Sequence, residues 1–359
     1  MNREIAGLRL QNQYINSSVI LEPGQVVRAL GAVQAQDYMQ AVWAIGVRTP
    51  SAGLAGVERA IAERSILLTW SLRGTLHFAP PEDVKWMIQL CAPRLLRQSV
   101  RRLEQLELDD KTLGRCRKLI YNALKNGKCL ARPDLLKVLE SDGISTAGQR
   151  GYHILWHSAY NGLICFGPLA GKQQTFVLLD EWVPVSRELS YEESLAELAQ
   201  RYFTTHGPAT VQDFAWWTGL TLTDARVGLD AVRAELVSEL IEGIEYWMPD
   251  KRAASGEALG VQLLPGFDEY LLGYKDRSAV LEPEAAQQVV PGNNGMFMPM
   301  IVEEGQIIGT WKRTIKKKGA ELLLLPFKPL KDHSREQLVS AAEAYAAFLG
   351  LPLTRLEYL

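Results

Sequence analysis

Residues 146–179 read TAGQRGYHILWHSAYNGLICFGPLAGKQQTFVLL, and this stretch decides the fold class of the chain. From Thr146 to Asn161 apolar residues recur every three or four positions, which predicts an amphipathic helix that Gly162 ends. Two short apolar runs, 163–166 and 175–179, enclose a turn-rich connection and predict a β-hairpin. Two further helices are predicted directly upstream, over residues 112–126 and 133–139. Helix, helix, helix and hairpin is the order of a winged helix.

The same order of patterns occurs on both sides of this stretch, although no sequence repeat is detectable. Upstream, three helices, a short hairpin and one longer helix are predicted over residues 4–15, 23–32, 36–44, 67–78 and 81–100. Downstream, three helices and two strands are predicted over residues 191–205, 210–218, 222–234, 236–241 and 244–248. Thr210 and Thr221 each precede an acidic residue by three positions, which is typical of a helix N-terminus.

Beyond residue 252 the chain changes character. Glycines punctuate short alternating apolar segments, which is typical of a small antiparallel barrel or sheet. Residues 334–349 predict a final amphipathic helix with Ser334 as its N-cap. The predicted fold is therefore α+β, with about three tandem winged-helix units and a C-terminal β-rich, barrel-like region. Its expected parts are residues 1–92, 93–188 and 189–252 for the three units and 253–359 for the C-terminal region.

The composition is that of a globular protein, with 47% hydrophobic and 22% charged residues in a chain of 359. No apolar run approaches the length of a membrane span, and the N-terminus lacks the apolar core of a signal peptide. The four cysteines contain no Cys-x-x-Cys pair, which favours free thiols in a reducing compartment. A cytoplasmic location without a membrane partner is expected.

The net charge of −2 argues against a nucleic-acid partner, but the distribution of charge argues for one. Residues 91–128 hold ten Lys or Arg against four Asp or Glu, and residues 312–331 hold seven against one. Residues 180–250 hold four against fourteen, so the predicted third unit is acidic. Two basic segments of this kind are the expected electrostatic footprint of a protein that contacts phosphates.

Three groups of residues are candidates for contacting DNA. Arg94, Arg97 and Arg101 form one stripe on the predicted helix, with Arg102 beside it, and Lys172 lies at the tip of a predicted wing. The third group is a predicted hairpin over residues 311–319, in which an aromatic residue precedes a cationic tip: Trp311, Lys312, Arg313, Lys316, Lys317 and Lys318. The alternatives are a solvated helix face for the arginines and an edge strand protected by lysines for the hairpin.

Gln34-Ala35-Gln36 is the motif most directly connected with chemistry. A pair of glutamine amides can hold a water molecule or a sugar oxygen, because each amide carries one acceptor oxygen and two N–H donors. An amide does not titrate near neutral pH, so a reaction at this pair has to be already activated and to need mainly positioning. The next residue, Asp37, is either a base or a helix cap, and the cap is favoured.

The motif and four further segments resemble the AlkZ/YcaQ-like winged-helix DNA glycosylases. The segments are residues 33–38, 70–78, 202–210, 264–270 and 309–313, so the resemblance covers nearly the whole chain. It implies removal of alkylated purines from double-stranded DNA, with Gln34 and Gln36 as the catalytic pair and no cofactor. Some relatives carry Gln-x-Asp, whereas this chain has two amides. His77 and Asp268 lie in these segments, but their roles do not follow from the sequence.

The resemblance and the residues together predict a monofunctional glycosylase that acts on cationic N7- or N3-alkylated purines, including bulky adducts or crosslinks. No metal is expected, because His153 and His157 have helical spacing but lack the adjacent Glu of a zinc protease. A monomer associated with the nucleoid is expected.

The main alternative is a non-catalytic winged-helix DNA-binding protein or transcriptional regulator. Its recognition helices would be residues 146–161 and 222–234, which are poor in Arg and Asn, and this disfavours base readout. A scaffold with no nucleic-acid role is a third alternative.

Overall fold

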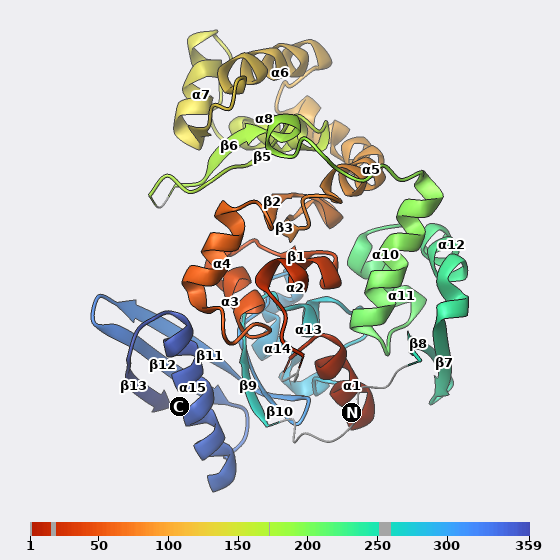
Figure 1. The fold of residues 1–359 in the computed structure, drawn as a ribbon, viewed down its shortest axis with the longest axis vertical. Helices are drawn as coiled ribbons and strands as arrows, with labels where there is room; N and C mark the ends of the chain where they lie inside the picture. Colours follow the sequence, from red (N-terminus) through yellow and green to blue (C-terminus); the bar gives the residue numbers. More distant parts are fainter. Residues whose placement is uncertain (1, 16–18, 172, 251–259) are drawn as a thin grey trace. The chain divides into compact units, whose positions relative to one another are not determined.

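The computed structural model describes residues 2–15, 19–171, 173–250 and 260–359 (Figure 1). Two compact units divide the chain: residues 61–194 form one, here called the middle unit, and residues 1–60 with 195–359 form the other, here called the terminal unit. The predicted site residue Lys172 lies outside the described residues. No helix in the described ranges is long and apolar enough to cross a membrane.

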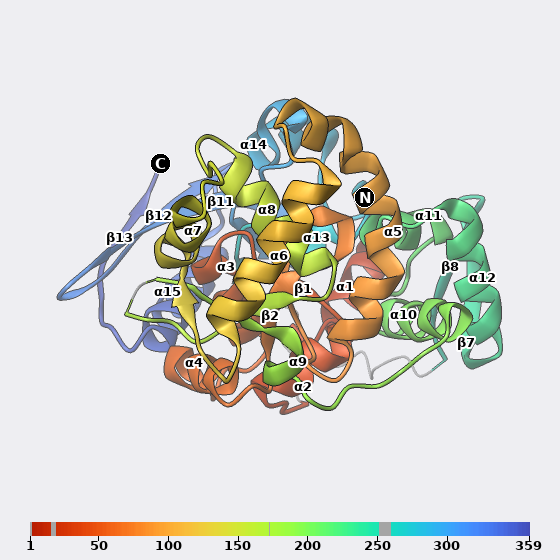
Figure 2. The ribbon, with the colours of Figure 1, turned by 90° about the horizontal axis from the view of Figure 1, so that it is seen from above.

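The middle unit begins with an antiparallel hairpin, β2 (Leu67–Trp70) and β3 (Leu76–Ala79), joined by a 3₁₀ turn at Leu72–Gly74. Its helices are α5 (Val84–Gln105), α6 (Asp110–Leu124), α7 (Arg132–Ser141), α8 (Arg150–Tyr160) and α9 (Leu179–Trp182). Its other strands are β4 (Leu130–Ala131), β5 (Ile164–Phe166) and β6 (Thr175–Leu178), which form a sheet in the order β4-β6-β5. Figure 2 shows α8 beside α6 and α5, against which it packs.

Apolar side chains from the hairpin and the sheet make the core of the middle unit. The rings of Trp70 and Phe166 lie 4.9 Å apart, and Phe166 lies 4.7 Å from Phe176. Tyr160 donates a hydrogen bond from its hydroxyl to the Ser71 carbonyl and so ties α8 to the hairpin. The helices and strands expected in this region are thus confirmed in kind and order.

The helical part of the terminal unit contains the predicted helices and strands in order, together with a helix over residues 53–62 and a short strand over residues 33–34 that the sequence does not predict. Its elements are α1 (Arg3–Asn12), α2 (Pro23–Leu30), β1 (Val33–Gln34), α3 (Tyr38–Gly46), α4 (Gly53–Ala62), α10 (Tyr191–His206), α11 (Val211–Thr218), α12 (Leu222–Val232), a 3₁₀ turn at Arg233–Glu235, β7 (Leu236–Ile241) and β8 (Ile244–Pro249). Thr210 and Thr221 are N-caps of α11 and α12, as predicted, because their hydroxyls accept the backbone N–H of Asp213 and Asp224.

The C-terminal region is an open five-stranded sheet in the order β13-β12-β11-β10-β9. Its strands are β9 (Val261–Leu264), β10 (Met300–Glu303), β11 (Gln306–Lys316), β12 (Gly319–Pro326) and β13 (Leu353–Tyr358). Strands β9 to β12 pair antiparallel, whereas β13 pairs parallel to β12. Among the described residues β9 and β13 are the two edges of this sheet. The predicted barrel-like closure is therefore not found.

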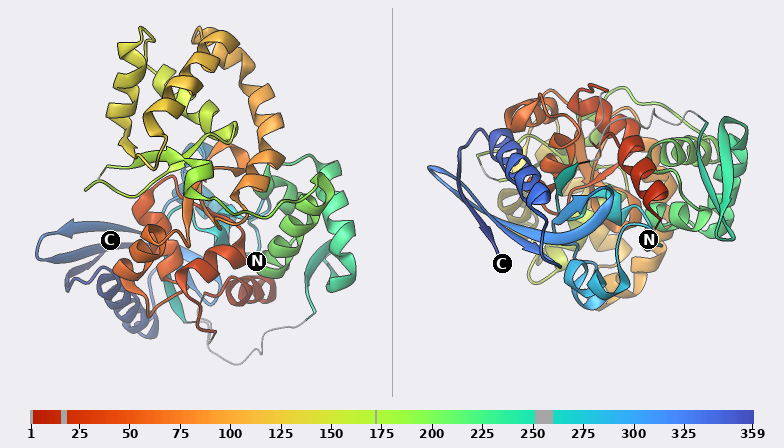
Figure 3. Two further views of the ribbon diagram at one scale, coloured as in Figure 1. Left: turned by 45° about the horizontal axis from the view of Figure 1, so that its top comes forward. Right: turned by 90° about the horizontal axis from the view of Figure 1, so that it is seen from below.

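Four short helical segments and one long helix complete the terminal unit: α13 (Glu269–Leu272), α14 (Ala286–Val289), 3₁₀ turns at Pro283–Ala285 and Pro291–Asn293, and α15 (Asp332–Phe348). Helix α15 packs against β9, β12 and β13 (Figure 3, right). It begins after Lys331, and Ser334 is buried within its first turn, so the prediction of Ser334 as its N-cap is wrong.

Candidate functional site

The Gln-x-Gln motif lies in the connection between α2 and α3. Gly31 ends α2 with a φ of +80°, a conformation that favours glycine, and two residues later the chain forms the short strand β1. Gln34 is 6% exposed and Ala35 1% exposed, whereas Gln36 is exposed. One amide of the pair is therefore set into the protein, and the other faces outward.

Asp37, which follows the motif, is the N-cap of α3. Its Oδ1 accepts the backbone N–H of Gln40 at 3.1 Å, as the preferred interpretation of the sequence predicted. The same oxygen lies 3.8 Å from Nη2 of Arg313, whose side chain is 17% exposed. The structure thus brings Arg313, at the base of the basic hairpin, beside the Gln-x-Gln motif.

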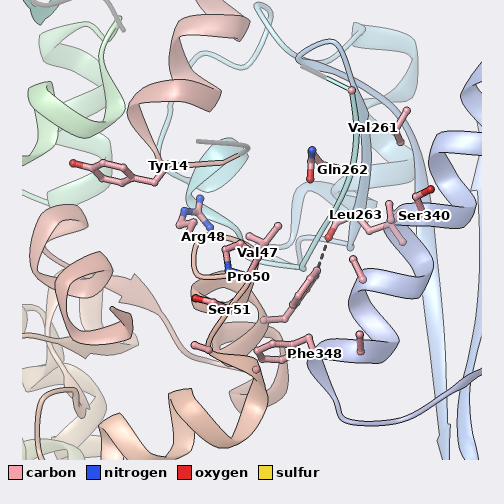
Figure 4. A pocket seen from close by; sticks show the side chains of 18 of the residues that line it. Tyr14, Val47, Arg48, Pro50, Ser51, Val261, Gln262, Leu263, Ser340 and Phe348 are labelled. Carbon is pink, nitrogen blue, oxygen red and sulfur yellow. Dashed lines mark hydrogen bonds between the residues drawn. The ribbon is translucent and has the colours of Figure 1, made fainter. Parts of the chain in front are cut away.

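Side-chain hydrogen bonds fix helix α3 to strand β9 and to the connection that follows it. The Gln40 side chain accepts the backbone N–H of Gly266 at 3.1 Å, and the Trp43 indole N–H donates to the Leu263 carbonyl at 2.8 Å (dashed in Figure 4). Because α3 begins directly after Gln36 and Asp37, these bonds also fix the downstream side of the motif.

Trp311 is a core residue and not an exposed aromatic beside the cationic tip. It is 0% exposed, its indole N–H donates to the Leu264 carbonyl at 2.8 Å, and its ring lies 4.9 Å from that of Tyr345. The prediction that Trp311 contacts DNA is therefore wrong. The side chain is oriented inward because residues alternate between the two faces of β11, so that Trp311 is buried and Lys312 exposed.

The remaining residues of the predicted hairpin lie on β11 and at its turn. Strands β11 and β12 pair in register up to Lys316 and Gly319, so Lys317 and Lys318 form the turn. Lys312, Lys316, Lys317 and Lys318 are exposed, and Lys316 pairs with Glu321. The hairpin therefore presents a cationic tip, as the sequence predicts.

The four predicted arginines lie on α5, in the middle unit. Arg97 and Arg101 are exposed, and Arg97 donates to its own helix at the Pro93 carbonyl over 3.1 Å. Arg102 donates to Gln149 at 2.6 Å and to Gln105 at 3.1 Å. Arg94 is half-buried, and its Nη1 has no hydrogen-bond partner among the described residues. Arg97 and Arg101 are thus the members of the stripe most available to a partner.

A buried polar network lies directly behind Gln34. Glu269 is 0% exposed; its Oε1 accepts the Gln34 backbone N–H at 3.2 Å, and its Oε2 accepts the Trp217 indole N–H at 2.7 Å. His206, also 0% exposed, has its Nε2 3.5 Å from Oε2. Burial lowers the pKa of His206, although the neighbouring Glu269 acts in the opposite direction.

A buried ion pair lies next to this network, because one of its members, Asp268, directly precedes Glu269 in the chain. Both side chains, Arg48 and Asp268, are 0% exposed, and the guanidinium binds both carboxylate oxygens at 2.9 Å. Arg48 also donates to the Gln13 and Ala44 carbonyls, at 2.9 and 2.7 Å. Asp268 in turn is the N-cap of α13, where it accepts the Tyr270 N–H at 2.9 Å. Asp268 therefore has a structural role, which the sequence could not assign.

His77 is also buried, and its ring contacts nearby groups of the β2–β3 hairpin. Nδ1 lies 3.1 Å from the Thr75 carbonyl, and Nε2 lies 3.5 Å from a guanidinium nitrogen of Arg73. Since the ring is 0% exposed, these contacts indicate a structural role in the middle unit.

A cavity of about 700 Å³ opens at the other end of α3 from the motif (Figure 4). Its wall is made by residues of α3, the α3–α4 connection, β9 and α15, among them Trp43, Arg48, Gln262 and Phe348. Neither Gln34 nor Gln36 lines it. The guanidinium of Arg48 at the cavity wall is already paired with the Asp268 carboxylate, so Arg48 is not available to bind an anion in the cavity.

The histidines at 153 and 157 lie on α8. Within the described ranges no group of three or more His, Cys, Asp or Glu is placed to hold an ion. Burial lowers the pKa of both rings, and that of His157 falls to about 4, with the Arg117 cation acting in the same direction.

This shift predicts a loss of stability in mild acid. In an unfolded chain the pKa of a histidine is about 6.5. Between that value and about 4 the unfolded chain binds more protons at His157 than the folded chain does, so the free energy of unfolding falls as the pH falls. His157→Gln should reduce this fall, as measured by urea unfolding at pH 7 and pH 5. If the free energy of unfolding falls as much between pH 7 and pH 5 in His157→Gln as in the wild type, His157 is not the source of the pH dependence.

Sequence reasoning missed the buried partners of the motif: Glu269, Trp217 and His206. His206 and Glu269 lie in segments 202–210 and 264–270, which resemble the glycosylase family, and this resemblance is the sequence signal that points to them. Glu269 is 235 positions from Gln34, and no local pattern connects residues at such a separation.

Comparisons with known proteins give one consistent result. A family model described as "DNA glycosylase AlkZ-like" matches residues 27–348. The interstrand DNA cross-link repair glycosylase of Streptomyces sahachiroi is 26% identical in an alignment 350 positions long, which covers 90% of this chain and 90% of the relative. The solved structure of Streptomyces sahachiroi DNA glycosylase AlkZ aligns over 100% of both chains, with a TM-score of 0.83 and 24% identity. This structural match shows a common fold.

Proposed function

The chain belongs to the AlkZ-like DNA glycosylase family, and on that premise we propose that it releases cationic N7- or N3-alkylated purines from duplex DNA through Gln34 and Gln36. As a member of a glycosylase family it is an enzyme, which decides against the non-catalytic DNA-binding alternative. The observation that carries the proposal is the placement of two amides on one short segment whose backbone is fixed at both ends. Glu269 fixes it at Gln34, and the cap of α3 fixes it after Gln36.

The proposed chemistry uses the charge that the lesion already carries. When the bond between C1′ and the alkylated base breaks, its electron pair goes to the base and neutralises the cation, so no acid is needed to protonate the leaving group. The sugar becomes an oxocarbenium-like cation, to which water adds at C1′ and then loses a proton to solvent. The amide oxygens of Gln34 and Gln36 orient this water and place negative dipole ends near the sugar.

No lysine nucleophile takes part in this mechanism, so the product is an intact strand with an abasic site. A duplex with a single N7-methylguanine should yield the free base, and the strand should break only after later treatment with alkali. Chromatography of the free base and a denaturing gel of the strand test both points. Strand cleavage without alkali would contradict the monofunctional mechanism, and absence of free base would contradict the function.

The proposal extends to bulky N7 adducts and crosslinks. The Streptomyces sahachiroi relative is named for repair of interstrand crosslinks, and its similarity extends over 90% of this chain. Gln36 is exposed, and the described cavity is not lined by either glutamine, so nothing in this arrangement requires a small lesion.

Winged-helix units are the proposed scaffold for DNA binding. From α6 to β6 the middle unit runs helix, strand, helix, helix, strand, strand, and its sheet order places the last strand in the centre. This is the connectivity expected of a winged helix. The proposed phosphate contacts are the exposed arginines of α5 in this unit and the basic hairpin of the terminal unit.

The hairpin makes a prediction about salt dependence. Replacing Lys316, Lys317 and Lys318 with alanine should weaken binding to undamaged duplex and flatten the plot of log K against log salt. The slope should change by about 0.9 for each lysine that neutralises a phosphate. Fluorescence anisotropy over a salt series measures both quantities. Lys328→Ala, which removes an exposed lysine beyond β12, is the matched control. Equal slopes for the triple variant and the control would exclude the hairpin as a phosphate contact.

A further inference from the structure

Glu269 occupies an unusual position for an acidic residue. It is the first residue of α13, it is 0% exposed, and it lies directly behind the strand that carries Gln34. Burying a carboxyl group is costly unless its oxygens are hydrogen-bonded. An apolar residue would leave the buried N–H donors around this position without an acceptor, which is also costly.

Both oxygens of Glu269 accept hydrogen bonds from groups that can only donate. Oε1 accepts the Gln34 backbone N–H at 3.2 Å, and Oε2 accepts the Trp217 indole N–H at 2.7 Å. Backbone N–H and indole N–H groups have no acceptor function. A side chain here must therefore offer two acceptor oxygens at once, which a carboxylate does and an amide does not.

The carboxylate is held in place independently of the motif. Asp268, its neighbour in sequence, caps α13 and is bound through both oxygens to Arg48. Trp217 lies on α11, and its ring packs beside Gly31, three residues before Gln34. A Cβ atom added to Gly31 would lie 3.6 Å from the ring. The motif is therefore supported by α11 and α13, which the hydrogen bond between Trp217 and Glu269 joins to each other.

We infer that Glu269 is a positioning residue for base excision: it fixes the backbone of Gln34 and thereby aims the Gln34 amide at the reacting sugar. The inference rests on the proposed function of the Gln-x-Gln pair and adds a third residue to it. Glu269 does not touch the substrate. Its effect is transmitted through the hydrogen bond to β1, and misplacement of a reacting group by about 1 Å can cost about 100-fold in rate.

Glu269→Gln tests this directly, because it keeps the shape of the side chain and removes one acceptor. Whichever way the amide turns, one of its N–H groups faces the N–H of Gln34 or of Trp217. The single-turnover rate constant for N7-methylguanine release should fall about 10- to 100-fold. The Kd for a duplex with an uncleavable lesion analogue should stay unchanged.

A second substitution separates positioning from general damage to the structure. Trp217→Phe removes the competing indole donor, so that in the double variant Trp217→Phe/Glu269→Gln the amide oxygen can turn to the Gln34 N–H. Glu269→Gln should therefore have little effect in the Trp217→Phe background. In a Gln34→Ala background it should likewise cause little further loss, since the side chain that it aims is already absent.

Asp83 provides the matched control. It is a buried carboxylate of the middle unit, 0% exposed, and its Oδ1 accepts the indole N–H of Trp86 at 2.9 Å. Asp83→Asn should destabilise the protein and leave the excision rate of the folded fraction unchanged.

The outcomes distinguish the inference from the function on which it rests. If the wild type releases no base, the proposed function fails. If the wild type releases base and Glu269→Gln does so at the same rate, the inference alone is overturned. It is also overturned if the rate loss persists undiminished in the Trp217→Phe and Gln34→Ala backgrounds.

Discussion

Replacing Gln34 and Gln36 together with alanine is expected to lower the rate constant for N7-methylguanine release at least 100-fold. Loss of a single preorganised polar group from an active site typically costs about 100- to 1,000-fold, and this variant loses two. The measurement is a single-turnover time course on a labelled duplex with excess enzyme. Binding should persist, because the proposed phosphate contacts lie on α5 and on the hairpin and are not altered.

Gln212→Ala is the matched control for this experiment. Gln212 is an exposed glutamine on α11, in the acidic part of the chain, and its removal should leave both binding and excision unchanged. A double variant that excises the base at the rate of this control would contradict the catalytic assignment. A double variant that no longer binds the duplex would instead place the pair in DNA recognition.

Arg48→Met is expected to have the largest effect on stability. It removes one partner of an ion pair in which both side chains are 0% exposed, and so leaves the Asp268 carboxylate buried without its cation. Breaking a buried pair from one side typically costs about 3–5 kcal/mol of the free energy of unfolding. Urea unfolding, followed by circular dichroism, measures this loss from the shift in midpoint.

A surface pair gives the comparison for Arg48. The side chains of Lys137 and Asp134 are 71% and 56% exposed, so Lys137→Met should leave the midpoint of unfolding unchanged. If Arg48→Met shifts the midpoint no more than Lys137→Met does, the ion pair does not support the site. Because Asp268 caps α13 beneath the motif, Arg48→Met should also slow excision.

Local signals predicted the helical parts of the fold well. The helix expected at residues 23–32 is α2, Pro23–Leu30, and the one expected at 222–234 is α12, Leu222–Val232. These helices carry their own start signals, a proline in the first turn or a threonine cap, and need no distant partner. The count of winged-helix units stays a prediction, since the chain divides by contacts into the middle unit and the terminal unit.

The C-terminal sheet shows where local signals are insufficient. The parallel pairing of β13 with β12 requires α15 to connect two strands across the sheet, and no short pattern encodes such a crossover. The sequence predicts Trp311 beside the cationic tip because it adjoins Lys312. The two-residue period of a strand places these neighbours on opposite faces, and it accounts for the buried Trp311 beside the exposed Lys312.

The candidate site was predictable only in part, for the same reason. Gln34, Gln36 and the cap at Asp37 lie within four residues, and the motif identified them. Glu269, Trp217 and Arg313 join them only after the chain has folded. Their roles depend on distances between segments that are far apart in sequence, which a single sequence does not contain.

The central claim is that two amides suffice because the lesion carries its own activating charge. The most direct test compares release of two bases by the wild-type enzyme from otherwise identical duplexes: cationic N7-methylguanine and neutral hypoxanthine. Single-turnover chromatography of the free bases should show release of N7-methylguanine and at least 100-fold slower release of hypoxanthine, since the amide pair supplies no acid to activate a neutral leaving group. Comparable release of both bases would contradict the account, because a group that protonates the leaving base would then have to exist.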